Sequence, residues 1–74
     1  MKIKVGDYFY DGLGVYGRTK RLFIVREILG NFCYPIEAYA LGSSSRLLFG
    51  LLEVEPYIMT DEEEIAMYIL GDNQ

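Results

Sequence analysis

A ten-residue segment of alternating side chains, residues 32–41 (FCYPIEAYAL), restricts the fold of this chain more than any other feature. Apolar residues at every second position over such a length are typical of a β-strand with one buried face. Gly30-Asn31 precedes the segment and suits a two-residue hairpin turn, and Gly42-Ser43-Ser44-Ser45 follows it as a second turn. The sequence therefore predicts an antiparallel sheet. The expected core face holds Phe32, Tyr34, Ile36, Ala38 and Ala40, and the expected outer face holds Cys33, Pro35, Glu37 and Tyr39.

Four further segments are expected to be strands of the same sheet. They are residues 2–5, where polar and apolar side chains alternate, residues 22–29, which are β-branched and aromatic, and residues 46–49 and 51–56. In the last segment Leu52 and Val54 are expected to point inward. Five short strands joined by tight turns predict a mainly β protein, built as a small antiparallel β-barrel of about five strands.

A short C-terminal α-helix is expected after the barrel. Thr60 suits the N-cap position, Glu63 completes a capping box, and the acidic residues there favour the positive end of the helix dipole. Gly71 suits the C′ position. Because a helix of about ten residues is marginal by itself, its apolar stripe is expected to dock on one end of the barrel or on another subunit. That stripe consists of Ile65, Ala66, Ile69 and Leu70.

Three stretches follow one another in a recognisable order: KVGDYFYDGLG at residues 4–14, IVREILGNFCYPIEAYALG at residues 24–42 and RLLFGLLEVEPY at residues 46–57. This order resembles that of small SH3-like β-barrel proteins encoded by bacteriophages and prophages of Gram-positive bacteria. The resemblance covers residues 2–57. The matching positions are Lys4, Val5, Gly6, Asp7, Ile28, Tyr34, Pro35, Gly42, Phe49, Leu52, Glu53 and Pro56.

The resemblance implies an SH3-like barrel over residues 1–57. The helical pattern described above adds an appendage of the same domain over residues 58–71, followed by a tail at residues 72–74. Two features depart from the family pattern. The turn after residue 41 has three serines where an acidic residue before glycine is usual, and residues 60–70 add a helix. We expect a function particular to this protein at these departures.

The composition predicts an interface. Of the 74 residues, 51% are hydrophobic, including seven Tyr and four Phe. A domain of this length buries only roughly 60% of the surface that its unfolded chain exposes, so we expect some apolar surface to contact a protein partner or a second copy. The charge is also uneven. All seven basic residues lie in residues 1–46, whereas residues 47–74 contain seven of the 11 acidic residues.

The residue types present argue against catalysis. The chain has no histidine, which removes Ser-His-Asp and Cys-His mechanisms and most general-base chemistry near neutral pH. The single Cys33 has no imidazole partner and allows no intrachain disulfide. Residues 61–64 are acidic, but a helix start explains them without a metal ion. We therefore expect no enzyme activity, no catalytic residue, no metal site and no cofactor.

The N-terminal sequence MKIKVGDYFYDG has charges and a turn where a signal peptide needs an apolar core. No run approaches the roughly 18 consecutive apolar residues of a membrane span. A single cysteine without a partner suits a reducing compartment. We expect a soluble protein without a membrane anchor and, given the resemblance, located in the cytoplasm of the bacterial host.

The candidate binding residues form two groups. Guanidinium groups bind phosphate and tyrosine rings stack on bases, which favours a small nucleotide as ligand of the first group: Tyr16, Arg18, Lys20, Arg21, Tyr39 and Arg46. The net charge of −4 argues against duplex DNA as a partner. The second group is acidic and would engage a host protein by mimicking a phosphate backbone: Glu53, Glu55, Glu62, Glu63 and Glu64.

The stretch Gly42-Ser43-Ser44-Ser45-Arg46 has a composition that suggests a phosphate-binding loop. It lacks the lysine and the following helix of a P-loop, so we expect a hairpin turn with solvent-facing serines. The preferred function is that of a non-enzymatic phage or prophage accessory protein that binds and inhibits a bacterial host protein, for example a defence protein. The alternative is a homo-oligomer that sequesters a small nucleotide signal between its subunits, and a third hypothesis is a virion structural or assembly component.

Overall fold

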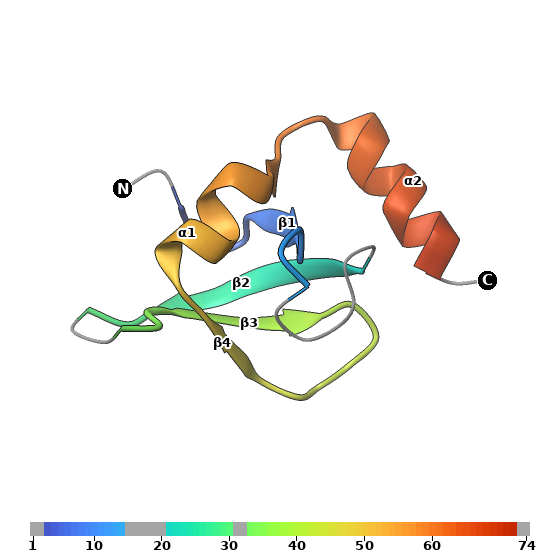
Figure 1. Cartoon of the computed structure of the whole chain (residues 1–74). Helices are drawn as coiled ribbons and strands as arrows, with labels where there is room; N and C mark the ends of the chain where they lie inside the picture. Colours follow the sequence, from blue (N-terminus) through green and yellow to red (C-terminus); the bar gives the residue numbers. More distant parts are fainter. Residues whose placement is uncertain (1–2, 15–20, 31–32, 73–74) are drawn as a thin grey trace.

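The computed structural model describes residues 3–14, 21–30 and 33–72, which form one antiparallel sheet and short helices (Figure 1). The sheet has five strands in the order β4-β3-β2-β1-β5. Each of the strands β1 to β4 pairs with the next one along the chain, and β5 returns to pair with β1. The elements in chain order are β1 (Tyr8–Tyr10), β2 (Leu22–Ile28), β3 (Ile36–Ala40), β4 (Leu47–Phe49), α1 (Leu51–Val54), the 3-10 helix η1 (Glu55–Tyr57), β5 (Ile58–Met59) and α2 (Glu62–Asp72).

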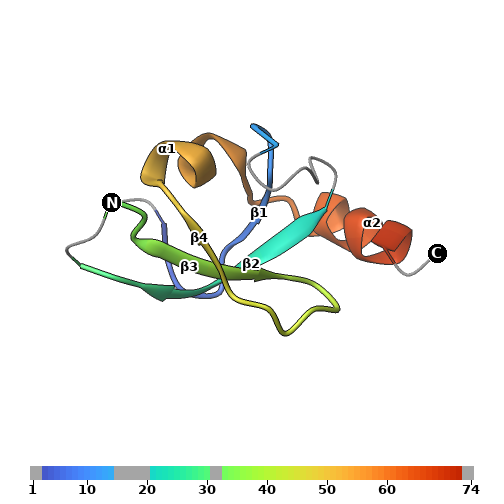
Figure 2. The same cartoon turned by 60° about the horizontal axis from the view of Figure 1, so that its bottom comes forward.

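The mainly β fold is confirmed, but the sheet is not closed into the predicted barrel. Within the described residues no ladder joins the outermost strands β4 and β5. The segment between them, which the alternation predicted to be a strand, forms α1 and η1 instead (Figure 2). Strands of three and two residues are left at the two edges, too short to close a barrel. Ile58–Met59, predicted to begin the helical appendage, belongs to the sheet through its pairing with β1.

Three phenylalanine rings form the centre of the core. Phe9 from β1, Phe23 from β2 and Phe49 from β4 are all fully buried. The ring centroids of Phe9 and Phe23 lie 5.5 Å apart in a stacked arrangement, and Phe49 meets both rings edge-on at 5.0 and 5.3 Å. These are favourable geometries for aromatic pairs. Val54 from α1 joins this cluster from outside the sheet, which explains why α1 lies over one face of the sheet in Figures 1 and 2.

The alternation in residues 32–41 predicted the faces of β3 correctly at some positions. Ile36, Ala38 and Ala40 are buried in the core as expected, and Cys33 is exposed. The strand is five residues long rather than ten. It begins after Pro35 because proline has no N–H to donate to a ladder.

Other residues of this segment contradict the prediction. Tyr34 is exposed, whereas Pro35 and Glu37 are buried. The antiparallel pairing of β2 with β3 is confirmed, but residues 29–35 connect the two strands instead of a two-residue turn. Leu29 N donates to Pro35 O at the base of this connection. Phe32 and part of the predicted turn lie outside the described residues.

The strand predicted at residues 2–5 is not present in the described residues 3–5. A turn replaces it: Asp7 N donates to Lys4 O at 3.0 Å, and Lys4 N donates to the Asp7 carboxylate at 2.8 Å. Gly6 has a φ of 94°, which glycine adopts without the steric cost of a side chain. The aspartate side chain thus satisfies the backbone locally, and the strand starts only at Tyr8.

Residues 51–57 are helical because Gly50 and Glu53 form the start of a helix. The Glu53 carboxylate accepts a hydrogen bond from Gly50 N at 2.5 Å, and Glu53 N donates to Gly50 O at 3.1 Å. The Glu53 side chain thus makes the carboxylate half of a capping box, and the backbone carbonyl of Gly50 accepts from the Glu53 amide where a cap side chain would otherwise do so. As a result Val54 is buried as predicted, whereas Leu52 is 81% exposed rather than directed inward.

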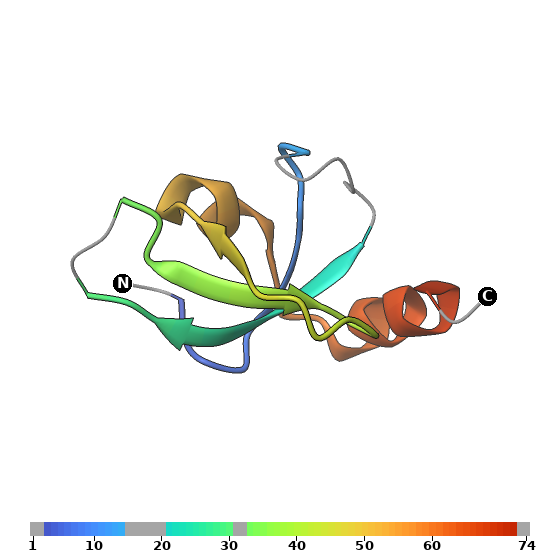
Figure 3. The ribbon, with the colours of Figure 1, turned by 90° about the horizontal axis from the view of Figure 1, so that it is seen from below.

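The C-terminal helix α2 is confirmed, with different ends. Asp61, not Thr60, caps it: the Asp61 carboxylate accepts from Glu63 N at 2.9 Å, and Asp61 O accepts from Ile65 N. The helix continues through Gly71 to Asp72. It contacts β2 and β5 at the end of the sheet that lies away from α1 (Figure 3). Of the predicted stripe, Ile65 and Ile69 are half-buried, whereas Ala66 and Leu70 are exposed.

Candidate functional site

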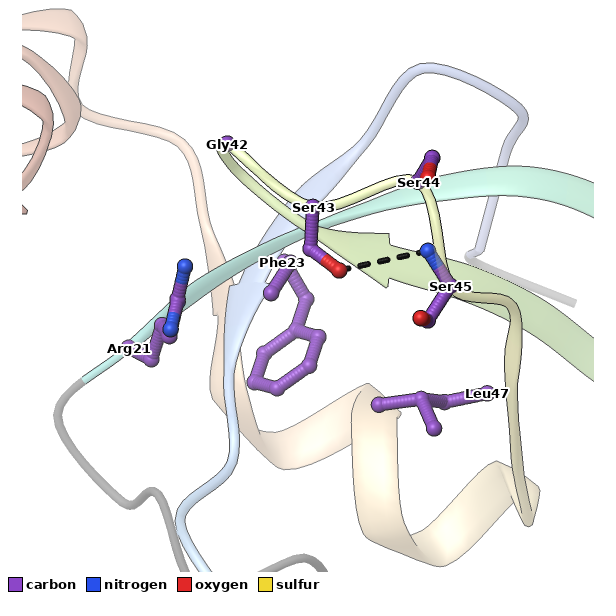
Figure 4. Close-up of a pocket in the computed structure, with 8 residues that line it drawn as sticks. Arg21, Phe23, Gly42, Ser43, Ser44, Ser45 and Leu47 are labelled. Atoms are coloured by element: carbon purple, nitrogen blue, oxygen red, sulfur yellow. Dashed lines mark hydrogen bonds between the residues drawn. The ribbon is translucent and has the colours of Figure 1, made fainter.

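A pocket lies where the turn between β3 and β4 meets the start of β2 (Figure 4). It has a volume of about 630 Å³. Its polar side comes from Arg21 and from the turn at residues 42–45, and its apolar side comes from strand residues. The complete lining is Arg21, Phe23, Ala40, Gly42, Ser43, Ser44, Ser45 and Leu47. The pocket therefore combines one cation and three hydroxyl groups with an apolar wall.

The turn that carries the serines has a defined backbone. Ser43 N donates to Ala40 O at 3.0 Å, and Gly42 has a φ of 82°. A positive φ at the third of four residues is typical of a type II turn and explains why glycine stands there. The Ser43 hydroxyl oxygen accepts from Ser45 N at 3.2 Å (Figure 4). The predicted hairpin turn is confirmed, and local hydrogen bonds hold two of its serines.

Arg21 is attached to the same turn. Its Nη2 donates to Leu41 O at 2.9 Å, and Leu41 N donates in turn to Leu22 O at 3.1 Å. The Nε atom of Arg21 is buried and has no hydrogen-bond acceptor among the described residues. Within the same residues Arg21 forms no ion pair, since the salt bridge found there joins Arg46 to Glu37.

Arg46 is used differently. Its Nε lies 3.4 Å from the Glu37 carboxylate, and the side chains of Arg46 and Glu37 are 61% and 10% exposed. Glu37 faces away from the core residues Ile36 and Ala38, since successive side chains of a strand alternate between faces. The burial of Glu37, which the alternation did not predict, is thus accompanied by a charged partner. The charge of Arg46 is balanced within the protein.

Replacing Arg46 by alanine is expected to lower the free energy of unfolding by about 1–2 kcal/mol, because the buried Glu37 carboxylate loses its partner. The loss should be measured by urea denaturation at pH 7. In a Glu37→Gln background the carboxylate charge is absent, so Arg46→Ala should cost less than about 0.5 kcal/mol. An equal cost in both backgrounds would show that the pair does not stabilise the fold.

The predicted site residues do not form one site in the described structure. Tyr16, Arg18 and Lys20 lie outside the described residues. Arg21 lines the pocket, Arg46 is paired with Glu37, and Tyr39 is half-buried on the face of β3 opposite to the pocket residue Ala40. Among the acidic candidates, Glu53 bonds to Gly50, and the exposed residues are Glu55, Glu62, Glu63 and Glu64.

The sequence does not predict the serines as pocket residues. Of the serines predicted to face solvent, Ser44 and Ser45 are exposed, whereas Ser43 is half-buried. The contact of this turn with Arg21 joins residues 20 positions apart in the chain, Arg21 and Leu41, and local pattern does not predict it. The antiparallel register, in which Phe23 lies opposite Ala40, brings the two segments together. The run of serines after glycine was the available signal.

Several large apolar side chains remain on the surface of the described residues. Three of them occur close together in the chain, at the end of β4 and the start of α1: Leu48, Leu51 and Leu52, here called the surface leucines. Leu48 is 45% and Leu52 is 81% exposed. On α2, Met67 and Leu70 are also exposed. Exposed apolar side chains that gather in one patch are a common mark of a protein-protein contact surface.

The described residues contain no cluster of three or more metal-ligating side chains. Among them, no helix has the length and apolar character needed to cross a membrane. Comparison of the chain with models of known protein families, with curated protein sequences and with solved structures finds no match.

Proposed function

We propose that this chain is a non-enzymatic binding protein, and that it is a phage or prophage accessory protein that binds and inhibits a bacterial host protein. The observation that carries the binding role is the exposure of the surface leucines on β4 and α1. Apolar side chains at the centre of an interface are shielded from water by a partner and supply much of the binding energy. The viral origin rests on the resemblance of residues 2–57 alone.

The SH3-like relationship is part of the same proposal. It is supported by the strand order, in which four neighbouring strands follow one another and the last strand returns beside the first. The open edge between β4 and β5 would then be a variation of that fold. In this arrangement α1 takes the place of a closing strand and presents Leu51 and Leu52 at the surface.

The binding role can be tested with the variant Leu52→Lys. Wild-type protein and variant are each immobilised and exposed to bacterial lysate, and a captured protein is identified and purified for calorimetry. We expect the variant to bind that protein about tenfold or more weakly, as for a central interface residue. Leu13→Lys is the matched control, because Leu13 is also exposed but lies in the turn after β1.

A wild-type protein that captures nothing above background would contradict the proposal, and so would equal affinity of the two lysine variants. Light scattering tests whether the surface leucines instead contact a second copy of the chain. A mass near 8.5 kDa at high concentration contradicts the homo-oligomer that the sequence offered as an alternative. A larger mass that falls to this value in Leu52→Lys assigns the surface to self-association.

A further inference from the structure

The guanidinium of Arg21 is a partly buried positive charge without a counter-ion among the described residues. Among the described residues its side chain donates one hydrogen bond, from Nη2 to Leu41 O. The six residues that immediately precede it in the sequence, 15–20, contain no aspartate or glutamate. Moving a charge out of water without a partner is unfavourable, and an anion beside this guanidinium would offset that cost. The unused N–H groups of Arg21 could donate hydrogen bonds to such an anion.

A comparison with Arg46 makes the difference clear. The two arginines flank the serine turn, Arg21 just before β2 and Arg46 just before β4. Arg46 is mostly exposed and is paired with Glu37 at 3.4 Å, whereas Arg21 is less exposed and lines a pocket in which no acidic residue takes part. The protein therefore neutralises the more solvated of the two cations and leaves the less solvated one open toward the pocket.

The serine turn adds donors of the right kind beside this cation. A Cβ atom at Gly42 would lie 3.8 Å from Nη2 of Arg21, so the backbone of the turn comes close to the guanidinium. Ser43 is the next residue in the chain. Its oxygen accepts from Ser45 N, which leaves its hydroxyl hydrogen to be donated elsewhere. The hydroxyls of Ser44 and Ser45 line the same pocket.

The apolar wall strengthens this arrangement. Phe23, Ala40 and Leu47 lower the local polarity, and a charge-assisted hydrogen bond is worth more beside such groups than in open water. The volume of about 630 Å³ is within the range of small-molecule sites. A guanidinium and several hydroxyls suit a group with three terminal oxygens better than a carboxylate, which has two.

We propose that the pocket of Arg21 and Ser43, Ser44 and Ser45 binds the phosphate group of a small phosphorylated molecule. Arg21 supplies the charge and the hydroxyls orient the oxygens, while the apolar wall accommodates part of the attached molecule. The site is independent of the surface leucines. Failure of the host-protein proposal therefore leaves it standing, and its own failure leaves that proposal unaffected.

The test is a titration of the ¹⁵N-labelled full chain followed by NMR, at constant ionic strength, with three probes: inorganic phosphate, adenosine 5′-monophosphate and adenosine. We expect saturable shifts of the Ser43, Ser44 and Ser45 amides with both phosphorylated probes and none with adenosine. Arg21→Gln should raise the dissociation constant for phosphate about tenfold or more, as for the loss of a charged hydrogen bond. Arg26→Gln makes the same charge change at an exposed position on β2 outside the pocket and should leave it within about twofold.

Ser43→Ala provides a second variant that does not depend on the fold tolerating the loss of Arg21. It should weaken phosphate binding about threefold to tenfold, as for the loss of one neutral hydrogen bond. Equal weakening by Arg21→Gln and Arg26→Gln would overturn the proposal, because only net charge would then matter. Absence of saturable shifts up to millimolar phosphate, shifts that map to other residues, or adenosine binding as tightly as its monophosphate would overturn it as well.

Discussion

Replacing Phe9 by alanine is expected to leave the protein largely unfolded at 25 °C. Phe9 is fully buried and its ring contacts those of both Phe23 and Phe49, at centroid distances of 5.5 and 5.0 Å. Such a truncation typically costs about 3–5 kcal/mol. A single core in a domain of this size supplies no more than about the same amount, so little or no stability remains. Circular dichroism during heating should show no cooperative transition for Phe9→Ala.

Two variants control for this result. Phe9→Leu keeps most of the buried volume, so we expect a cooperative transition at a lower temperature than in the wild type. Leu13→Ala removes an exposed side chain instead and should change the free energy of unfolding by no more than about 0.5 kcal/mol. A Phe9→Ala protein that melts cooperatively within a few degrees of the wild type would refute the central role of the aromatic cluster.

Replacing Gly12 by alanine is expected to lower the free energy of unfolding by about 1–3 kcal/mol, because the new methyl group overlaps an aromatic ring. A Cβ atom at Gly12 would collide with the ring of Tyr57 in η1. That ring cannot move freely, since it also packs edge-on against Tyr10 at a centroid distance of 5.1 Å. Urea denaturation measures the loss. Gly12 has no positive φ in this structure, so the cause is steric.

A double-mutant cycle separates this cause from a general effect of alanine in the turn. In a Tyr57→Ala background the space beside Gly12 is empty, and Gly12→Ala should then cost less than about 0.5 kcal/mol. Gly30→Ala is the matched control, because a Cβ atom there has no neighbour within 4 Å. A cost of Gly12→Ala that is the same with and without the Tyr57 ring would contradict the explanation.

The sheet could be predicted where local pattern and long-range packing agree. The alternation of Ile36, Ala38 and Ala40 matches a buried strand, and the apolar run at residues 22–25 matches the buried first half of β2. The prediction failed where a short polar contact outweighed the alternation. At Gly50 and Glu53 a hydrogen bond from the Gly50 amide to the Glu53 carboxylate starts a helix in a segment whose apolar residues alternate as in a strand. A two-residue periodicity cannot show that the Glu53 carboxylate bonds to the backbone three residues earlier.

The failure at Glu37 has a different origin. The alternation places its side chain on the outer face of β3, but an outer face is not always an exposed one. The side chain is covered and lies beside Arg46, which the strand pairing of β3 with β4 brings near. In the same way, Arg21 was recognised as a candidate for anion binding, whereas its neighbours in the pocket depend on the register between β2 and β3. The residue-by-residue register between strands is the information that the local pattern of one sequence does not contain.

The ladder between β1 and β5 has a consequence for the order in which the protein folds. Phe9 pairs with Ile58, near opposite ends of the described chain, and these strands share only two registered pairs. During synthesis β1 to β4 precede β5, so β1 cannot complete its second ladder until residues 58–59 have left the ribosome. Contacts of such high sequence separation form late because a long loop must first be closed. Until then Phe9, at the centre of the core, belongs to a strand with one edge still unprotected, and this stage of translation is when the nascent chain is most exposed to aggregation.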